Sequence, residues 1–117
     1  MRSGLEELLF GFDERIRYVA ILDQMGRTIS GGMRPGLDSL EPKEEADKVD
    51  VQMALVSGMM KGGVVHLGKT NYVIIHREKL MLVAVPGNND QTALISMKPD
   101  FPIERIPAII DMVGSAP

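Results

Sequence analysis

The sequence predicts one domain of the α/β class (α+β), with a single antiparallel sheet of five or six strands and helices on both faces. A chain of 117 residues, 44% of them hydrophobic, has the size and composition of one domain with one core. Its strand-forming segments follow one another through short turns, which favours antiparallel pairing. Some are apolar on both sides and therefore need cover on both faces. The expected order over residues 1–117 is α-β-β-α-β-β-β-β-α.

The first three expected elements lie before residue 34. Ser3 and Glu6 have the spacing of a capping box, which predicts a helix over 5–12. Apolar residues then recur at helical spacing: Leu5, Leu8, Leu9 and Phe12. Residues 17–23 are apolar on both sides of an extended chain and predict a central strand. After a turn at 24–26, residues 27–33 contain two glycines and predict an edge strand.

A second helix is expected over 42–60, and it has two apolar stripes. The first stripe consists of Ala46, Val49, Met53, Val56 and Met60. The second, on the roughly opposite side, consists of Val51, Leu55 and Met59. Two interpretations remain open: one wide core face, or a second stripe that packs on another subunit.

The remainder predicts strands over 64–67, 71–76, 80–85 and 92–97, separated by turn-forming residues. A last helix is expected over 103–113, and Pro107 should kink or restart it. Its apolar stripe consists of Ile103, Ile106, Ile110 and Val113. Residues 114–117 are expected to be a frayed tail.

Composition excludes several classes of function. The formal charge of −3 argues against a nucleic-acid partner, and the absence of cysteine excludes a disulfide framework and thiolate metal sites. The longest apolar run, 80–86, is far shorter than the roughly 20 residues of a membrane-spanning helix. Glu6 and Glu7 interrupt the apolar start, which argues against a signal peptide. A cytoplasmic protein without membrane contacts is expected.

One formal motif is rejected. Residues 63–70 match the spacing of the phosphate-binding loop, G-x-x-x-x-G-K-[ST], but that loop requires a strand before it and a helix after it. Here a helix is expected before the match and a strand after it. His66 and His76 have no third ligand at metal-site spacing, and Asp23 before Gly26 is typical of a turn. We expect no catalytic residues, no cofactor and no metal.

Residues 18–29 combine an apolar strand, an Asp, a Gly three residues later and a strand of smaller residues. This hairpin, the helices around it and the hairpin of 72–76 with 80–85 resemble the roadblock/dynein light chain family, which has a profilin-like architecture. The resemblance covers about residues 5–85 and is closest to archaeal members of the group.

The resemblance implies a non-enzymatic homodimer that pairs through its middle helix and an adjacent strand, and that scaffolds or regulates a small Ras-like GTPase. It places these residues at or near the dimer interface: Val51, Leu55, Met59, Val64 and His66. Strand 92–97 departs from the order expected for the family. It favours, as the alternative, a PAS-like or GAF-like small-molecule sensor with a pocket between sheet and helices.

Overall fold

The computed structural model describes residues 4–37, 66–87 and 90–115. The predicted helix over 42–60 and the residues Ser3, Val64 and Val65 lie outside this part of the chain. The described elements are α1 (Gly4–Phe12), β1 (Ile16–Leu22), β2 (Thr28–Met33), β3 (Val73–His76), β4 (Met81–Pro86), β5 (Thr92–Met97), the 3-10 helix η1 (Ile103–Arg105) and α3 (Ile106–Ser115).

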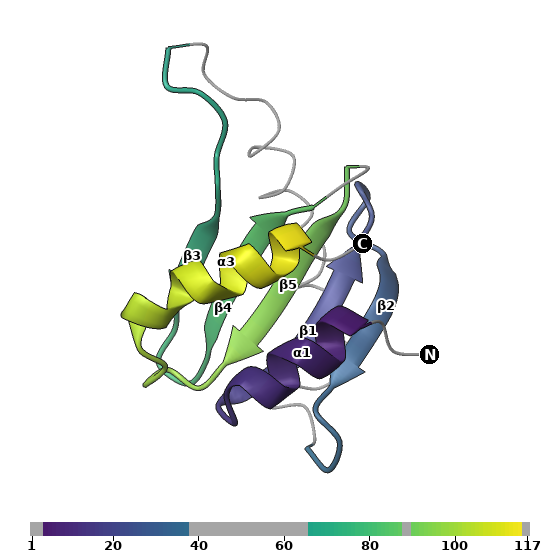
Figure 1. Cartoon of the computed structure of the whole chain (residues 1–117), viewed down its shortest axis with the longest axis vertical. Helices are drawn as coiled ribbons and strands as arrows, with labels where there is room; N and C mark the ends of the chain where they lie inside the picture. Colours follow the sequence, from purple (N-terminus) through teal and green to yellow (C-terminus); the bar gives the residue numbers. More distant parts are fainter. Residues whose placement is uncertain (1–3, 38–65, 88–89, 116–117) are drawn as a thin grey trace.

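The strands form one five-stranded sheet in the order β2-β1-β5-β4-β3, and every neighbouring pair is antiparallel. The predicted antiparallel sheet is thereby confirmed. The hairpin β1–β2 and the meander β3–β4–β5 are joined by the pairing of β1 with β5, so the last strand lies at the centre of the sheet (Figure 1). β2 is an edge strand, as its glycines predict.

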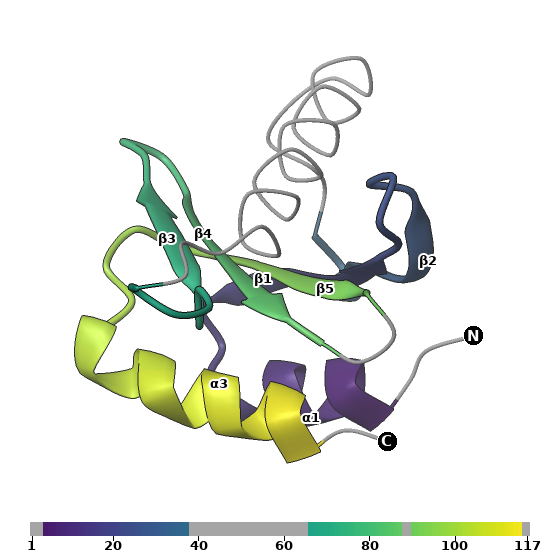
Figure 2. The ribbon, with the colours of Figure 1, turned by 90° about the horizontal axis from the view of Figure 1, so that it is seen from above.

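Both described helices lie on the same face of the sheet (Figure 2). The larger core cluster fills this layer, with Val19 of β1, Val83 of β4 and Ile95 of β5 beneath the helices. The smaller cluster consists of Ala20, Leu22, Leu82 and Leu94. Since side chains of a strand alternate between faces, β1 supplies both clusters, and its side chains divide between the two faces as predicted.

The buried side of each helix differs from the predicted stripe. In α1, Leu8 is 52% exposed, whereas Phe10 is buried beneath the guanidinium of Arg34. In the C-terminal segment, Ile103 belongs to η1 and is exposed, and α3 buries Ile106, Ile109 and Val113. Ile103 lies before the first residue of α3, outside the buried stripe of that helix.

The remaining differences concern element boundaries. Pro107 lies in the first turn of α3, where no backbone N–H is needed, so the helix restarts there as expected. Gly114 and Ser115, predicted to belong to a frayed tail, are the last residues of α3. His66 and Leu67 form a turn instead of continuing a strand over 64–67, and Gly68 follows with a φ of 80° that extended strands do not adopt.

Candidate functional site

Of the five predicted interface residues, the structure describes only His66. Val51, Leu55, Met59 and Val64 lie outside the described residues. His66 is exposed in the turn that precedes β3. Its neighbour Leu67 is 82% exposed, and Tyr72, directly before β3, is 43% exposed. Two exposed apolar side chains, Leu67 and Tyr72, therefore lie in the segment that leads into β3.

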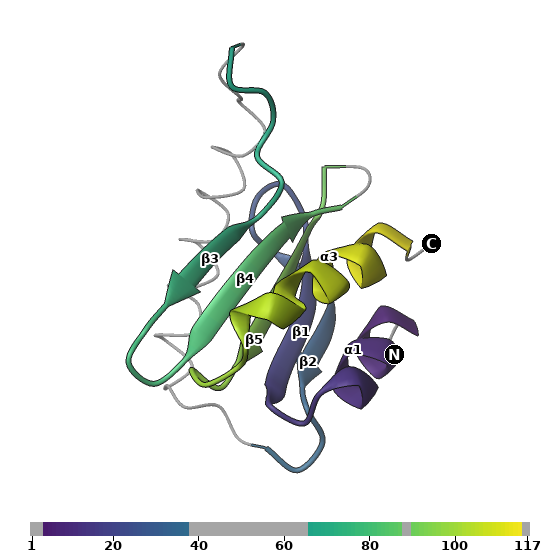
Figure 3. The same ribbon diagram turned by 60° about the vertical axis from the view of Figure 1, so that its left-hand side comes forward.

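β3 forms one edge of the five-stranded sheet, and β4 is its neighbour in the sheet (Figure 3). Its register with β4 is regular from Val73 opposite Ala84 to His76 opposite Met81. The strand contains two isoleucines and a valine, which suit a flat, extended edge. A regular edge strand of this kind has backbone groups that can pair with another chain.

The opposite edge, β2, is built differently. Its register with β1 shifts near Ile21, and Gly31 has a φ of 116°. A Cβ atom on Gly31 would lie 2.1 Å from the carbonyl oxygen of Val19, so only glycine fits against β1 here. Bulges and glycines twist an edge and reduce its ability to pair. Of the two edges, β3 is the better candidate for strand pairing.

His76 connects the β3 edge to the segment before η1. Its Nε2 lies 3.1 Å from the carbonyl oxygen of Pro99, within hydrogen-bond distance. The residue is exposed at the end of β3. This contact joins the end of β3 to the segment that precedes η1 at the protein surface.

A second candidate site, which the sequence did not reveal, lies where α1 meets β1. Asp13 is buried there, and its carboxylate accepts hydrogen bonds from the backbone N–H of Arg15 (2.8 Å), from Arg15 Nε (2.9 Å) and from Arg15 Nη2 (2.7 Å). Arg105 Nη1 donates to the same carboxylate. The hydrogen bond from the Arg15 side chain is the main reason that the pKa of Asp13 is lowered to about 2, although burial opposes the shift.

Arg34 completes this corner by donating to three backbone carbonyls. Its Nε donates to Ile16, and its Nη2 donates to Phe10 and Asp13 over 2.7–2.8 Å. Each of the three guanidiniums also stacks on a phenylalanine ring: Arg34 on Phe10, Arg15 on Phe101 and Arg105 on Phe12. The corner ties α1, β1, the end of β2 and η1 together around the buried carboxylate of Asp13.

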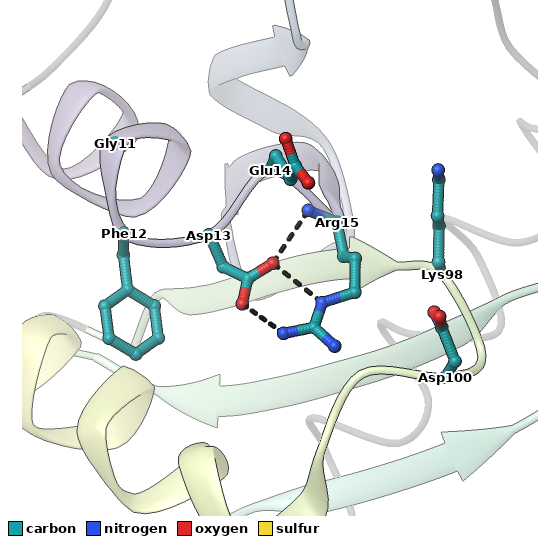
Figure 4. A pocket seen from close by; sticks show the side chains of 7 residues that line it. All are labelled: Gly11, Phe12, Asp13, Glu14, Arg15, Lys98 and Asp100. Atoms are coloured by element: carbon teal, nitrogen blue, oxygen red, sulfur yellow. Dashed lines mark hydrogen bonds and ion pairs between the residues drawn. The ribbon is translucent and has the colours of Figure 1, made fainter.

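A depression of about 590 Å³ opens beside this corner, lined by Gly11, Phe12, Asp13, Glu14, Arg15, Lys98 and Asp100 (Figure 4). Three carboxylates and two cations line it, and Arg15 points toward Asp13. The depression lies outside the apolar layer between sheet and helices, so it does not favour the sensor alternative. The ion pairs of Asp13 with Arg15 and Arg105 hold the elements of this corner together.

Comparison with known proteins identifies the fold. No family model matches the sequence, and no curated protein matches it. Solved structures do match: the gliding protein MglB from Thermus thermophilus superposes with a TM-score of 0.75 at 12% identity, over 95% of this chain and 81% of that chain. A roadblock/LC7 domain from Streptomyces avermitilis gives 0.71 at 12% identity over 93% and 88% of the two chains. MglC from Myxococcus xanthus gives 0.69 at 12% identity over 93% and 89%.

The chain has the roadblock/LC7 fold. The expectation that strand 92–97 sets it apart from roadblock domains is wrong, because an MglB structure with a tetrameric arrangement matches over 97% of this chain. The part left unmatched is shorter than β5. β5 is also the strand that joins the two halves of the sheet, so a roadblock fold without it would lack its centre.

The described part of the structure tests the phosphate-loop match of residues 63–70. Gly68, Lys69 and Thr70 lead into β3 and not into a helix, so the phosphate-loop match is rejected in the described part of the motif.

Within 4–37, 66–87 and 90–115, no three His, Cys, Asp or Glu side chains form a group that could hold a metal ion. No helix among the described residues is long and apolar enough to cross a membrane.

Proposed function

We propose that this chain is a non-enzymatic, homodimeric interaction module of the cytoplasm that scaffolds or regulates a small Ras-like GTPase. The roadblock fold supports the proposal, because the family resemblance in the sequence implies pairing and GTPase partners. The observation that carries it is the regular β3 edge, which the exposed side chain of Tyr72 precedes. The opposite edge of the sheet, β2, has a register shift and a required glycine, and it is less suited to pairing with another strand.

In the proposed dimer, β3 of one protomer lies antiparallel to β3 of its partner and extends the sheet across a two-fold axis. Antiparallel pairs alternate between hydrogen-bonded and non-hydrogen-bonded residues. Since the Arg77 N–H donates to the Leu80 carbonyl, this alternation directs the backbone groups of Ile75 toward β4 and those of Ile74 outward. The exposed side chains of Leu67 and Tyr72 would lie beside the new strand pair. The predicted stripe of Val51, Leu55 and Met59 would contribute from the middle helix.

Light scattering and sedimentation equilibrium test the dimer. The unmodified chain should be a dimer at micromolar concentration, and Tyr72→Glu should shift it toward the monomer because two carboxylates would enter one interface. Ile103→Glu is the matched control, because Ile103 is 62% exposed and lies in η1, on the helical face of the sheet. A chain that stays monomeric at hundreds of micromolar would contradict the dimer.

Isothermal titration calorimetry tests the GTPase partner. The dimer is titrated with a small Ras-like GTPase from the same organism, loaded either with GDP or with a non-hydrolysable GTP analogue. A GTPase regulator should bind one nucleotide state at least about tenfold more tightly, which corresponds to about 1.4 kcal/mol. Failure of both states to bind would leave the scaffold dimer standing and remove the GTPase role.

A further inference from the structure

The tip of the β1–β2 hairpin exposes two large apolar side chains close together in the sequence. Met25, in the turn, is 68% exposed, and Ile29, in β2, is 53% exposed. An isolated exposed apolar side chain is common on protein surfaces, so exposure alone indicates little. The way in which the backbone holds these two side chains is more informative.

Asp23 fixes the turn that carries Met25. Its Oδ1 accepts hydrogen bonds from the backbone N–H groups of Met25 (2.8 Å) and Arg27 (2.9 Å), and its Oδ2 accepts one from Arg27 Nε (3.1 Å). Two backbone hydrogen bonds close the same turn, from Gly26 to Asp23 and from Asp23 to Arg27. Met25 is therefore displayed on a rigid loop, which lowers the entropy lost when a partner binds.

A β-bulge displays Ile29. Ile21 pairs with Ser30 and Leu22 pairs with Thr28, so Ile29 is the extra residue between two paired positions. Bulges change the direction of a side chain and are frequent beside functional sites. In a strand without a bulge, successive side chains alternate between the two faces of the sheet. The bulge interrupts this alternation at Ile29.

The charge at the tip selects the partner. The side chain of Arg27, between Met25 and Ile29 in the chain, is 79% exposed, while that of Asp23 is 28% exposed and engaged by the turn. Arg27 is ion-paired with Asp23 through its Nε, and its largely exposed guanidinium can meet a further carboxylate beside apolar side chains.

A second copy of this chain does not fit the tip. Two tips related by a two-fold axis would bring their Arg27 guanidiniums together, and like charges repel in such a contact. Two side chains also offer far less area than the roughly 800 Å² per partner of a stable interface. The tip suits a short segment of another protein.

We propose that the hairpin tip, defined by Met25, Arg27 and Ile29, binds a short segment of another protein in which apolar side chains alternate with carboxylates. This surface is separate from the proposed dimer edge. β2 and β3 lie at opposite edges of the five-stranded sheet, four strand spacings or about 19 Å apart.

Nuclear magnetic resonance titration of the full chain tests this surface with three blocked peptides: alternating leucine and glutamate, alternating leucine and lysine, and alternating serine and glutamate. The leucine–glutamate peptide should shift the amide signals of Met25, Arg27 and Ile29 in a saturable way. The other two peptides should bind at least about tenfold more weakly, since each lacks one of the two complementary features.

Ile29→Ser and Arg27→Gln should each weaken the leucine–glutamate peptide several-fold. Leu8→Ser is the matched control, because Leu8 on α1 is exposed to nearly the same extent as Ile29, 52% against 53%. Equal binding of the lysine peptide, unchanged binding by Ile29→Ser, or equal loss in Leu8→Ser would overturn the proposal. Light scattering on the same samples reports the dimer separately, so each proposal can fail without the other.

Discussion

Gly31 determines the shape of one sheet edge through the absence of a side chain. Its φ of 116° and the approach of the Val19 carbonyl leave no room for a Cβ atom. The neighbouring Gly32 has no atoms within 4 Å of where its Cβ would lie. The pair looked equivalent in the sequence, and only the pairing of β1 with β2 separates a required glycine from a replaceable one.

Gly31→Ala should therefore destabilise the fold by about 2 kcal/mol or more, because a strained φ and a backbone clash act together. Gly32→Ala should change the free energy of unfolding by less than about 0.5 kcal/mol. Urea denaturation of both variants measures the difference. Equal losses in the two variants would contradict the role assigned to Gly31.

Asp13 holds the corner between α1 and β1 through its carboxylate. Its pKa is lowered to about 2 from 3.8 in the unfolded reference, so its ionised form is favoured by folding. A lowered pKa contributes stability that is complete above the unfolded value and is lost as pH falls through the folded value. For this shift the contribution is about 2 kcal/mol at neutral pH.

Asp13→Asn should lose that contribution at pH 7, and the difference from the unmodified chain should shrink as pH falls from about 4 toward 2. Chemical denaturation of both chains across this pH range measures it. Asp100→Asn is a suitable control, because Asp100 is exposed beside the same depression. A difference that stays constant with pH would show that packing, and not the charge, stabilises the corner.

The helices show where periodicity succeeds and where it misleads. The existence and position of α1 and α3 followed from apolar spacing, but Leu8 and Ile103 were assigned to buried stripes and are exposed. In α1 the buried side is rotated toward Phe10, which meets Arg34 from the end of β2. A contact between residues 24 positions apart is not visible in local spacing.

The β3 strand can be tested as an element by removing one backbone donor. Ile74→Pro eliminates an N–H that the hydrogen-bond alternation directs away from β4, so the sheet should lose little internal pairing. In the proposed dimer that N–H lies in the new strand pair. Sedimentation should therefore show a weaker dimer while circular dichroism of the chain stays nearly unchanged. A dimer as tight as before would indicate that another surface holds it.

For the molecule as a whole, dimerisation should be coupled to stability. Any partner that binds only the folded state raises the midpoint of thermal unfolding by mass action. The midpoint should rise by several degrees when the protein concentration is raised about a hundredfold through the micromolar range. Tyr72→Glu should flatten this dependence, and scanning calorimetry measures both. A midpoint independent of concentration would argue against a coupled dimer.

The sequence alone determined the class of the fold, since the strands, the turns and the two described helices follow from local patterns and from glycine and proline positions. It also determined which formal motif to reject, because the phosphate loop needs a helix after it and residues 68–70 are followed by the strand-forming residues of β3. Only the tertiary structure decided that β5 lies between β1 and β4, that Gly31 is required against Val19, and that Asp13 gathers Arg15 and Arg105 into one corner. The physical reason is that these features depend on contacts between segments far apart in the chain, and local periodicity carries no information about such contacts.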